Sequence, residues 1–224
     1  MNVPTNYALH DEVYRVRRGS EDYPGWDDAK SFEEANAIVR EVMAWPEVPH
    51  SGRLLEIGCG AGNHLVPLAP EFELAGMDIS PTAIDWAKER AQAAGVTADV
   101  RAGDVRELPW DDATFDVVRD GHLLHCIIGD DRPKVLAEAR RVLKPGGTFI
   151  VFTMCGDKGL PADQWDPATR MCMRNGVATR YVGFADDIER EVRAADFEVV
   201  RAQIFPDEDP EGTEELVVVA RKPD

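Results

Sequence analysis

The 224-residue chain has few cysteines, and none of the four lies in a C-x-x-C pair. This spacing predicts neither a zinc site nor a disulfide framework, so we expect no bound metal. The chain also lacks a secretory signal and an apolar run of membrane length. Together these absences predict a soluble, cytoplasmic protein with reduced thiols.

Basic residues are also scarce, because 25 Lys and Arg stand against 42 Asp and Glu, for a net charge of -17. Such a surface repels nucleic acid phosphates and anionic membranes. We therefore expect no nucleic acid or membrane partner, but a small-molecule substrate and a monomer or homodimer. The acidic surplus either serves solubility alone or indicates a site for cationic substrates.

The most informative segment that is present covers residues 54–63, Leu-Leu-Glu-Ile-Gly-Cys-Gly-Ala-Gly-Asn. An apolar run of this kind predicts a buried strand that enters a tight turn. The glycines let backbone N–H groups approach a ligand that a Cβ would keep away. Their spacing differs from the G-x-G-x-x-G of dinucleotide-binding folds. Glu56 would repel a pyrophosphate but would suit an ammonium or sulfonium group.

Further landmarks follow in order along the chain. A second strand ends at Asp78, whose carboxylate can accept both hydroxyls of a ribose. Ser80 and Pro81 then predict the N-cap and first position of a helix. Later strands are expected at residues 98–105, which end in Gly-Asp-Val, at 115–120, and from 143 to 151.

Together these landmarks, from about residue 52 to 153, resemble those of the class I S-adenosylmethionine-dependent methyltransferases. The resemblance implies an α/β, Rossmann-like, doubly wound sheet of seven strands, mostly parallel with a C-terminal antiparallel hairpin. It implies S-adenosyl-L-methionine as cofactor and S-adenosyl-L-homocysteine as product. Asp104 would hold the adenine amino group, with an apolar neighbour against the ring. The implied cofactor-binding residues are Glu56, Gly58, Cys59, Gly60, Gly62, Asn63, Asp78, Ile79, Gly103, Asp104, Val105 and Asp120.

The domain organisation follows from the same resemblance. Residues 1–50 are expected to form an N-terminal lid segment and a helix, which a capping box starting at Ser31 would begin. Tyr14 and Trp26 would contact the cofactor through this lid, or would simply anchor the terminus on the core. Residues 51–224 would form the methyltransferase domain, with an acceptor-pocket insertion at about 154–182. A helix at 184–195 and strands at 197–205 and 214–221, joined by an acidic turn, would complete it.

The acceptor side is expected after the fourth strand, where Asp120, His122 and His125 follow one another. A hydroxyl acceptor requires a general base, and histidine suits that role. Both histidines could instead be structural. The insertion supplies the candidate substrate-binding residues Met154, Trp165, Arg174 and Tyr181, and Arg174 and Arg180 could hold a carboxylate.

These features predict methyl transfer from S-adenosylmethionine to a small molecule by in-line displacement. One alternative is a non-catalytic protein that binds S-adenosylmethionine or S-adenosylhomocysteine. Another is a nicotinamide-dependent reductase, against which the glycine spacing and the lack of a Tyr-x-x-x-Lys pair both argue.

Overall fold

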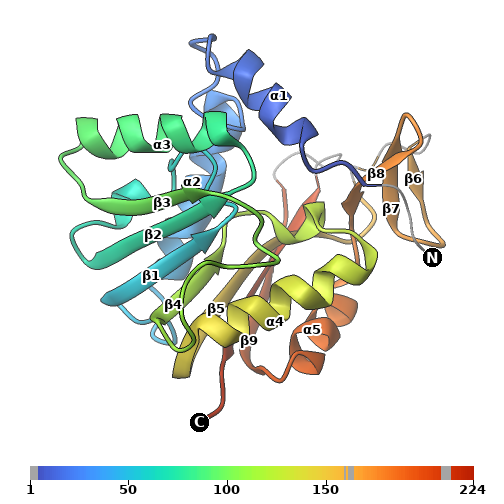
Figure 1. Ribbon diagram of the computed structural model, residues 1–224. Helices are drawn as coiled ribbons and strands as arrows, with labels where there is room; N and C mark the ends of the chain where they lie inside the picture. The colour runs from blue at the N-terminus through green and yellow to red at the C-terminus, as the bar shows by residue number, and fades with distance from the viewer. Residues whose placement is uncertain (1–4, 159, 161–163, 208–212) are drawn as a thin grey trace.

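The computed structural model describes residues 5–158, 160, 164–207 and 213–224, and a seven-stranded sheet forms its centre (Figure 1). The strand order is β3-β2-β1-β4-β5-β10-β9. Strands β1 to β5 are parallel, and β10 runs antiparallel to both β5 and β9. This topology confirms the predicted doubly wound sheet with its C-terminal hairpin. The strands are β1 (Gly52–Ile57), β2 (Phe72–Asp78), β3 (Ala98–Ala102), β4 (Phe115–Asp120), β5 (Leu143–Cys155), β9 (Glu198–Phe205) and β10 (Glu214–Arg221).

Helices cover both faces of the sheet because neighbouring strand residues point to opposite sides. Leu55 and Val118 pack with α4 (Arg132–Val142) and α5 (Ala185–Ala194) on one face. Leu54 and Val117 pack with α2 (Ala29–Met43) and α3 (Pro81–Ala93) on the other. The strands are therefore buried on both sides, as their continuous apolar runs predict.

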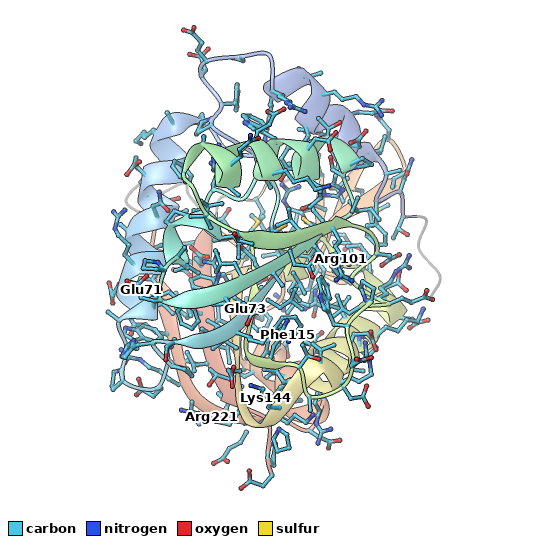
Figure 2. All side chains as sticks on the ribbon, turned by 60° about the vertical axis from the view of Figure 1, so that its left-hand side comes forward. Glu71, Glu73, Arg101, Phe115, Lys144 and Arg221 are labelled. Atoms are coloured by element: carbon cyan, nitrogen blue, oxygen red, sulfur yellow. The ribbon has the colours of Figure 1, made fainter. Side chains whose placement is uncertain are left out.

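Polar contacts close the end of the sheet at which β4 and β5 begin. Lys144 pairs with Asp116 at 2.7 Å, and Arg221 donates to the carbonyl of Glu47 at 2.9 Å. Figure 2 shows Lys144 and Arg221 together at this end. A ligand site in such a fold belongs to the opposite end, outside the carboxyl ends of the strands.

The start of α2 differs from the sequence prediction. The N-cap is Asp28, whose carboxylate accepts from the backbone N–H groups of Lys30 and Ser31 at 3.0 and 3.1 Å. The capping box predicted at Ser31 is wrong because this earlier aspartate satisfies the free N–H groups of the first turn.

The N-terminal segment contains a helix that the sequence analysis did not predict, α1 (Leu9–Arg17). Asp11 on this helix is buried. Its carboxylate accepts from the Ser80 hydroxyl at 2.7 Å and from the Thr82 N–H at 3.0 Å. These bonds fasten α1 to the start of α3.

The insertion after β5 forms a second, three-stranded antiparallel sheet. Its strands are β6 (Trp165–Asp166), β7 (Met171–Arg174) and β8 (Val177–Tyr181). Strand β8 lies against residues 124–126, which follow β4. Of the acidic turn expected at 206–212, residues 208–212 lie outside the described residues. No helix within the described ranges is long and apolar enough to cross a membrane.

The Asp11 contacts predict how α1 can be released. Asp11→Ala should speed tryptic cleavage after Arg17 or Arg18, because two hydrogen bonds to a charged group contribute about 1.5–3 kcal/mol each. Alanine is itself a good helix former, so faster cleavage would report undocking rather than loss of helix propensity. The control is Glu12→Ala, since Glu12 is an exposed acid in the same helical turn. Equal cleavage rates in the two variants would contradict this role of Asp11.

Candidate functional site

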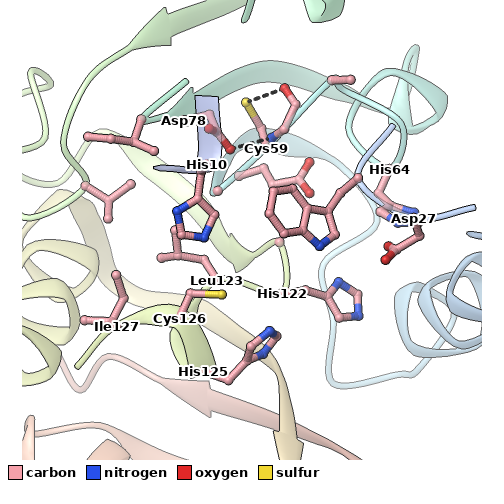
Figure 3. Close-up of a pocket in the computed structure, with 18 of the residues that line it drawn as sticks. His10, Asp27, Cys59, His64, Asp78, His122, Leu123, His125, Cys126 and Ile127 are labelled. Carbon is pink, nitrogen blue, oxygen red and sulfur yellow. Dashed lines mark hydrogen bonds between the residues drawn. The ribbon is translucent and has the colours of Figure 1, made fainter. Parts of the chain in front are cut away.

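A cavity of about 490 Å³ opens at the carboxyl ends of β1, β2 and β4 (Figure 3). Its walls come from the glycine loop, from the turns after these strands, from the N-terminal segment and from β8. The sequence-predicted residues that line it are Tyr14, Trp26, Glu56, Gly58, Cys59, Gly60, Asn63, Asp78, Ile79, Gly103, Asp104, Val105, His122, His125 and Met154.

The glycine loop forms the base of the cavity. The N–H groups of Gly58 and Cys59 both donate to the carbonyl of Met77, at 2.8 and 3.0 Å. Gly60 has φ +50°, and a Cβ there would collide with the Tyr14 hydroxyl. Gly62 also has a positive φ, but it does not line the cavity and shapes the turn instead.

Asp78 fixes this loop from the neighbouring strand. One carboxylate oxygen accepts from the N–H of Gly60 and the other from the N–H of Ser80, each at 2.9 Å. Burial raises the pKa of Asp78, although both hydrogen bonds act in the opposite direction. Each carboxylate oxygen keeps lone pairs that can face a ligand.

Glu56 forms a buried ion pair that the sequence analysis did not anticipate. Its Oε1 lies 2.7 Å from Nη2 of Arg119, the residue beside it on β4, and both side chains are about 1% exposed. Burial raises the pKa of Glu56 against the opposing charge of Arg119. The second oxygen, Oε2, is buried without a hydrogen-bond partner among the described residues. A cationic donor in the cavity would satisfy it.

The turn after β3 contributes Gly103, Asp104 and Val105. Arg106 Nε donates to Asp104 Oδ1 at 2.9 Å. The hydrogen-bonded guanidinium lowers the pKa of Asp104. Asp104 therefore faces the cavity as a carboxylate that already has one cationic partner.

The N-terminal segment covers the glycine loop. Tyr14 is 5% exposed, and its ring lies 5.4 Å from that of Trp26 in an edge-on arrangement. Asn63 Nδ2 donates to the carbonyl of Pro24 at 3.1 Å, which ties the loop to this segment. Both aromatic residues thus lie where a ligand bound on the loop would contact them.

His122 lies on the cavity wall with φ +62°, and its Nε2 is 2.5 Å from Glu215 Oε1. Burial alone would lower the pKa of His122, but the Glu215 carboxylate outweighs it and raises this pKa to about 9. A ring whose pKa is raised in this way is a poor proton acceptor at neutral pH, so the ion pair with Glu215 argues against His122 as a general base.

His125 is buried, and burial together with the charge of Arg180 lowers its pKa well below the ordinary value. Its Nδ1 accepts from the backbone N–H of Met154 at 3.4 Å, which leaves the proton of the neutral ring on Nε2. His125 can thus donate a hydrogen bond into the cavity but is a weak base. Burial likewise lowers the pKa of His64 to about 2.

Besides Gly62, four predicted residues lie outside the cavity lining. Asp120 is fully buried, and its carboxylate accepts from the N–H groups of Leu123 and Leu124. Burial raises its pKa to about 7. These bonds hold the turn after β4, and Asp120 is absent from the residues that line the cavity. The other three belong to the small sheet and are Trp165, Arg174 and Tyr181.

Sequence reasoning missed part of the lining. His10, His64, His122 and His125 are four of the five histidines in the chain, and all line this one cavity. Their convergence depends on tertiary packing and leaves no local signal. Within the described ranges, no three His, Cys, Asp or Glu side chains are arranged to hold a metal ion. Asp27 is a charged residue of the lining that the sequence analysis missed, whereas Arg180, which also lines the cavity, was predicted as a partner for a carboxylate.

The fold and the cavity define an α/β protein that binds a ligand over a glycine loop, at the carboxyl end of its sheet. Residues 55–151 match the family model described as a methyltransferase domain. A demethylmenaquinone methyltransferase from Bacillus cytotoxicus is 31% identical over 147 residues, which cover 63% of this chain and 60% of that protein. A 27-O-demethylrifamycin SV methyltransferase from Amycolatopsis mediterranei is 38% identical over 147 residues, which cover 62% of this chain and 53% of that protein.

A solved structure extends the fold likeness along the chain. The 1,6-didemethyltoxoflavin-N1-methyltransferase from Burkholderia thailandensis, with 1,6-didemethyltoxoflavin and S-adenosylhomocysteine bound, superposes with a TM-score of 0.71 at 23% identity. The match covers 100% of this chain and 94% of that one. The chain spans less than two thirds of the two curated relatives above. Residues 55–151 thus match a methyltransferase domain, in agreement with the resemblance to class I S-adenosylmethionine-dependent methyltransferases that the sequence landmarks implied.

The residues of the cavity fit the cofactor of this family. The amino-acid end of S-adenosylmethionine carries an ammonium group, and the unpartnered oxygen of Glu56 is available to it. The glycine loop gives the backbone room to approach the ligand, since the loop φ values are positive at Gly58 and Gly60.

The bonds of Asp78 predict a double effect of its removal. Asp78→Ala should weaken S-adenosylhomocysteine binding roughly 10- to 100-fold, which corresponds to about 1.5–3 kcal/mol from charge-assisted hydrogen bonds. It should also lower the free energy of unfolding, because the N–H of Gly60 loses its partner. Calorimetry and thermal unfolding measure the two effects. Asp85→Ala, on the exposed face of α3, is the control and should change neither. Unaltered binding by Asp78→Ala would remove this carboxylate from the site.

Proposed function

We propose that this protein transfers a methyl group from S-adenosylmethionine to a small-molecule acceptor by in-line displacement. The observation that carries the proposal is the continuity of one cavity. The same walls that hold Glu56, Gly60 and Asp78 continue to Trp26 and His122, where an acceptor can lie beside the cofactor. Three methyltransferases similar to this chain act, by their names, on small molecules.

The contacts described above suggest which residues of the cavity would bind S-adenosylmethionine. Glu56 Oε2 would accept from the ammonium group, and Asp78 would accept from the ribose hydroxyls. Asp104 and Val105 would hold the adenine. Residues 5–50 would act as a lid, with Tyr14 and Trp26 closing over the loop.

Bound S-adenosylmethionine supplies an activated methyl group, so the protein must mainly align the acceptor and exclude water. A hydroxyl acceptor must also lose a proton. Three of the cavity histidines are poor acceptors for it, because the pKa of His122 is raised to about 9, which favours its protonated form, and the pKa values of His64 and His125 are lowered.

Asp27 is the better proton acceptor. It lines the cavity, and its carboxylate has no hydrogen bond or ion pair to the described residues. Asp27 is exposed at the mouth of the cavity, yet desolvation by the surrounding cavity walls raises its pKa against the opposing charge of His122. A carboxylate whose pKa is shifted upward matches the requirement of a general base. Figure 3 shows Asp27 on the same side of the cavity as His122 and His64.

Binding and turnover separate this function from its alternatives. Calorimetry should show S-adenosylmethionine and S-adenosylhomocysteine binding without binding of NAD or NADP, because the unpartnered Glu56 oxygen disfavours a pyrophosphate. Transfer of labelled methyl groups to a panel of phenols, hydroquinones, amines, thiols and carboxylic acids should then identify an acceptor. Tight NAD binding would support a reductase instead. Cofactor binding without transfer to any compound would support a non-catalytic binding protein.

The Asp27 assignment predicts a specific pH profile with a hydroxyl acceptor from this panel. A base acts when it is deprotonated, so the rate should rise with pH through the raised pKa of Asp27. It should fall again near pH 9, where His122 loses its proton and its ion pair with Glu215. Asp27→Asn should lower kcat roughly 100-fold and abolish the rising limb.

Two controls test this profile. S-Adenosylhomocysteine binding should persist in Asp27→Asn, since the cofactor contacts do not involve residue 27. Glu33→Gln changes an exposed acid on α2 and should keep the wild-type profile. A wild-type profile in Asp27→Asn would show that catalysis rests on alignment alone.

A further inference from the structure

The cavity contains a guanidinium without a partner. Arg180 on β8 lines the cavity, and it makes no hydrogen bond or ion pair with the residues that the structure describes. Neighbouring arginines behave differently, since Arg106 pairs with Asp104 and Arg132 pairs with Glu191 at 2.6 Å. In a chain with 42 acidic residues, a cation left facing a cavity indicates a group that a ligand would complete.

The surroundings of Arg180 are positive. Its charge lowers the pKa of the buried His125, after the larger effect of burial. His122 adds a second cation, and because its Nε2 faces Glu215, the Nδ1–H of the ring remains available as a donor. Arg180 and the Nδ1–H of His122 are therefore two donors from which a negative ligand group can accept.

The acidic residues described in the same cavity form no ion pair with Arg180. Asp27 lines the cavity, and the charges of His122 and, more weakly, Arg180 lower its pKa. Asp207, which also lines the cavity, already has a partner. Arg180 is thus left for the ligand.

The rest of the acceptor side is apolar and aromatic. Trp26 and Phe32 line it from the N-terminal segment, and Met154 lines it from β5. An acceptor with a flat apolar body would pack against these side chains. A guanidinium fork matches the two oxygens of a carboxylate.

We propose that the acceptor is a small aromatic carboxylic acid whose carboxylate binds Arg180. This inference rests on the proposed methyl transfer, whose acceptor side it specifies. The sequence offered two arginines for such a group. The structure separates them, because Arg174 is exposed on β7 and lies outside the cavity lining.

Binding of model anions tests the proposal without any turnover. Benzoate and 2-naphthoate are titrated into the S-adenosylhomocysteine-saturated protein in a calorimeter, with benzamide and 2-naphthamide as neutral isosteres. Wild-type protein should bind each carboxylate about tenfold or more tightly than its amide, since a hydrogen-bonded charge pair is lost in the amide.

Arg180→Met should remove this preference, and Arg180→Lys should retain part of it because the charge remains while the fork is lost. Arg174→Met is the matched control and should bind both carboxylates as wild type does. Equal affinity for acid and amide in wild type, or an unchanged preference in Arg180→Met, would overturn the proposal. So would a loss of preference in Arg174→Met.

The same titrations distinguish this proposal from the proposed function. S-Adenosylhomocysteine binding is measured first in each variant, and it should be equal in all of them, which also shows that they are folded. If the protein prefers carboxylates but methylates no compound of the panel, the anion site at Arg180 is supported and the proposed methyl transfer is contradicted. If the protein methylates neutral acceptors and shows no preference for carboxylates, the proposed methyl transfer is supported and the anion site at Arg180 is contradicted.

Discussion

The carboxylate of Asp78 connects parts of the chain that are far apart in sequence. It accepts from the glycine loop through Gly60 and from the start of α3 through Ser80. The Ser80 hydroxyl accepts from the N–H of Ala83, which caps α3, and donates to Asp11 on α1. One acidic side chain at the end of β2 therefore positions the ligand loop, a helix and the N-terminal segment together. The Rossmann-like sheet provides the place for it, since β1 and β2 end side by side.

The charges that line the cavity differ from what the net charge of the chain suggests. The net charge is -17, yet Arg180 lines the cavity without an ion pair to the described residues. Several carboxylates nearby already have cationic partners: Glu56 with Arg119, Asp104 with Arg106 and Glu215 with His122. Net charge describes the surface seen from a distance, whereas a cavity responds to the few charges within its own low-dielectric walls.

The sheet and the cofactor side were predictable because their signals are local. Strands β4 and β10 have the bounds that their apolar runs indicate, and the glycine loop is readable from its spacing. The β6–β8 sheet and α1 were not predicted, because short polar elements depend on tertiary contacts such as Asp11 with Ser80. The protonation of His122 was equally unreadable, since its partner Glu215 lies on the last strand. The position of His122 after β4 suggested a general base, but in the fold His122 lies beside the Glu215 carboxylate.

The fastening of α1 by Asp11 has a kinetic consequence. Tyr14 on α1 lies against Gly60 of the loop. If residues 5–50 act as the proposed lid, exchange of spent cofactor for fresh cofactor would require the Asp11 bonds to break and re-form in each cycle. The lifetime of the docked helix would set an upper limit on how often the protein can turn over, whatever the speed of the chemical step.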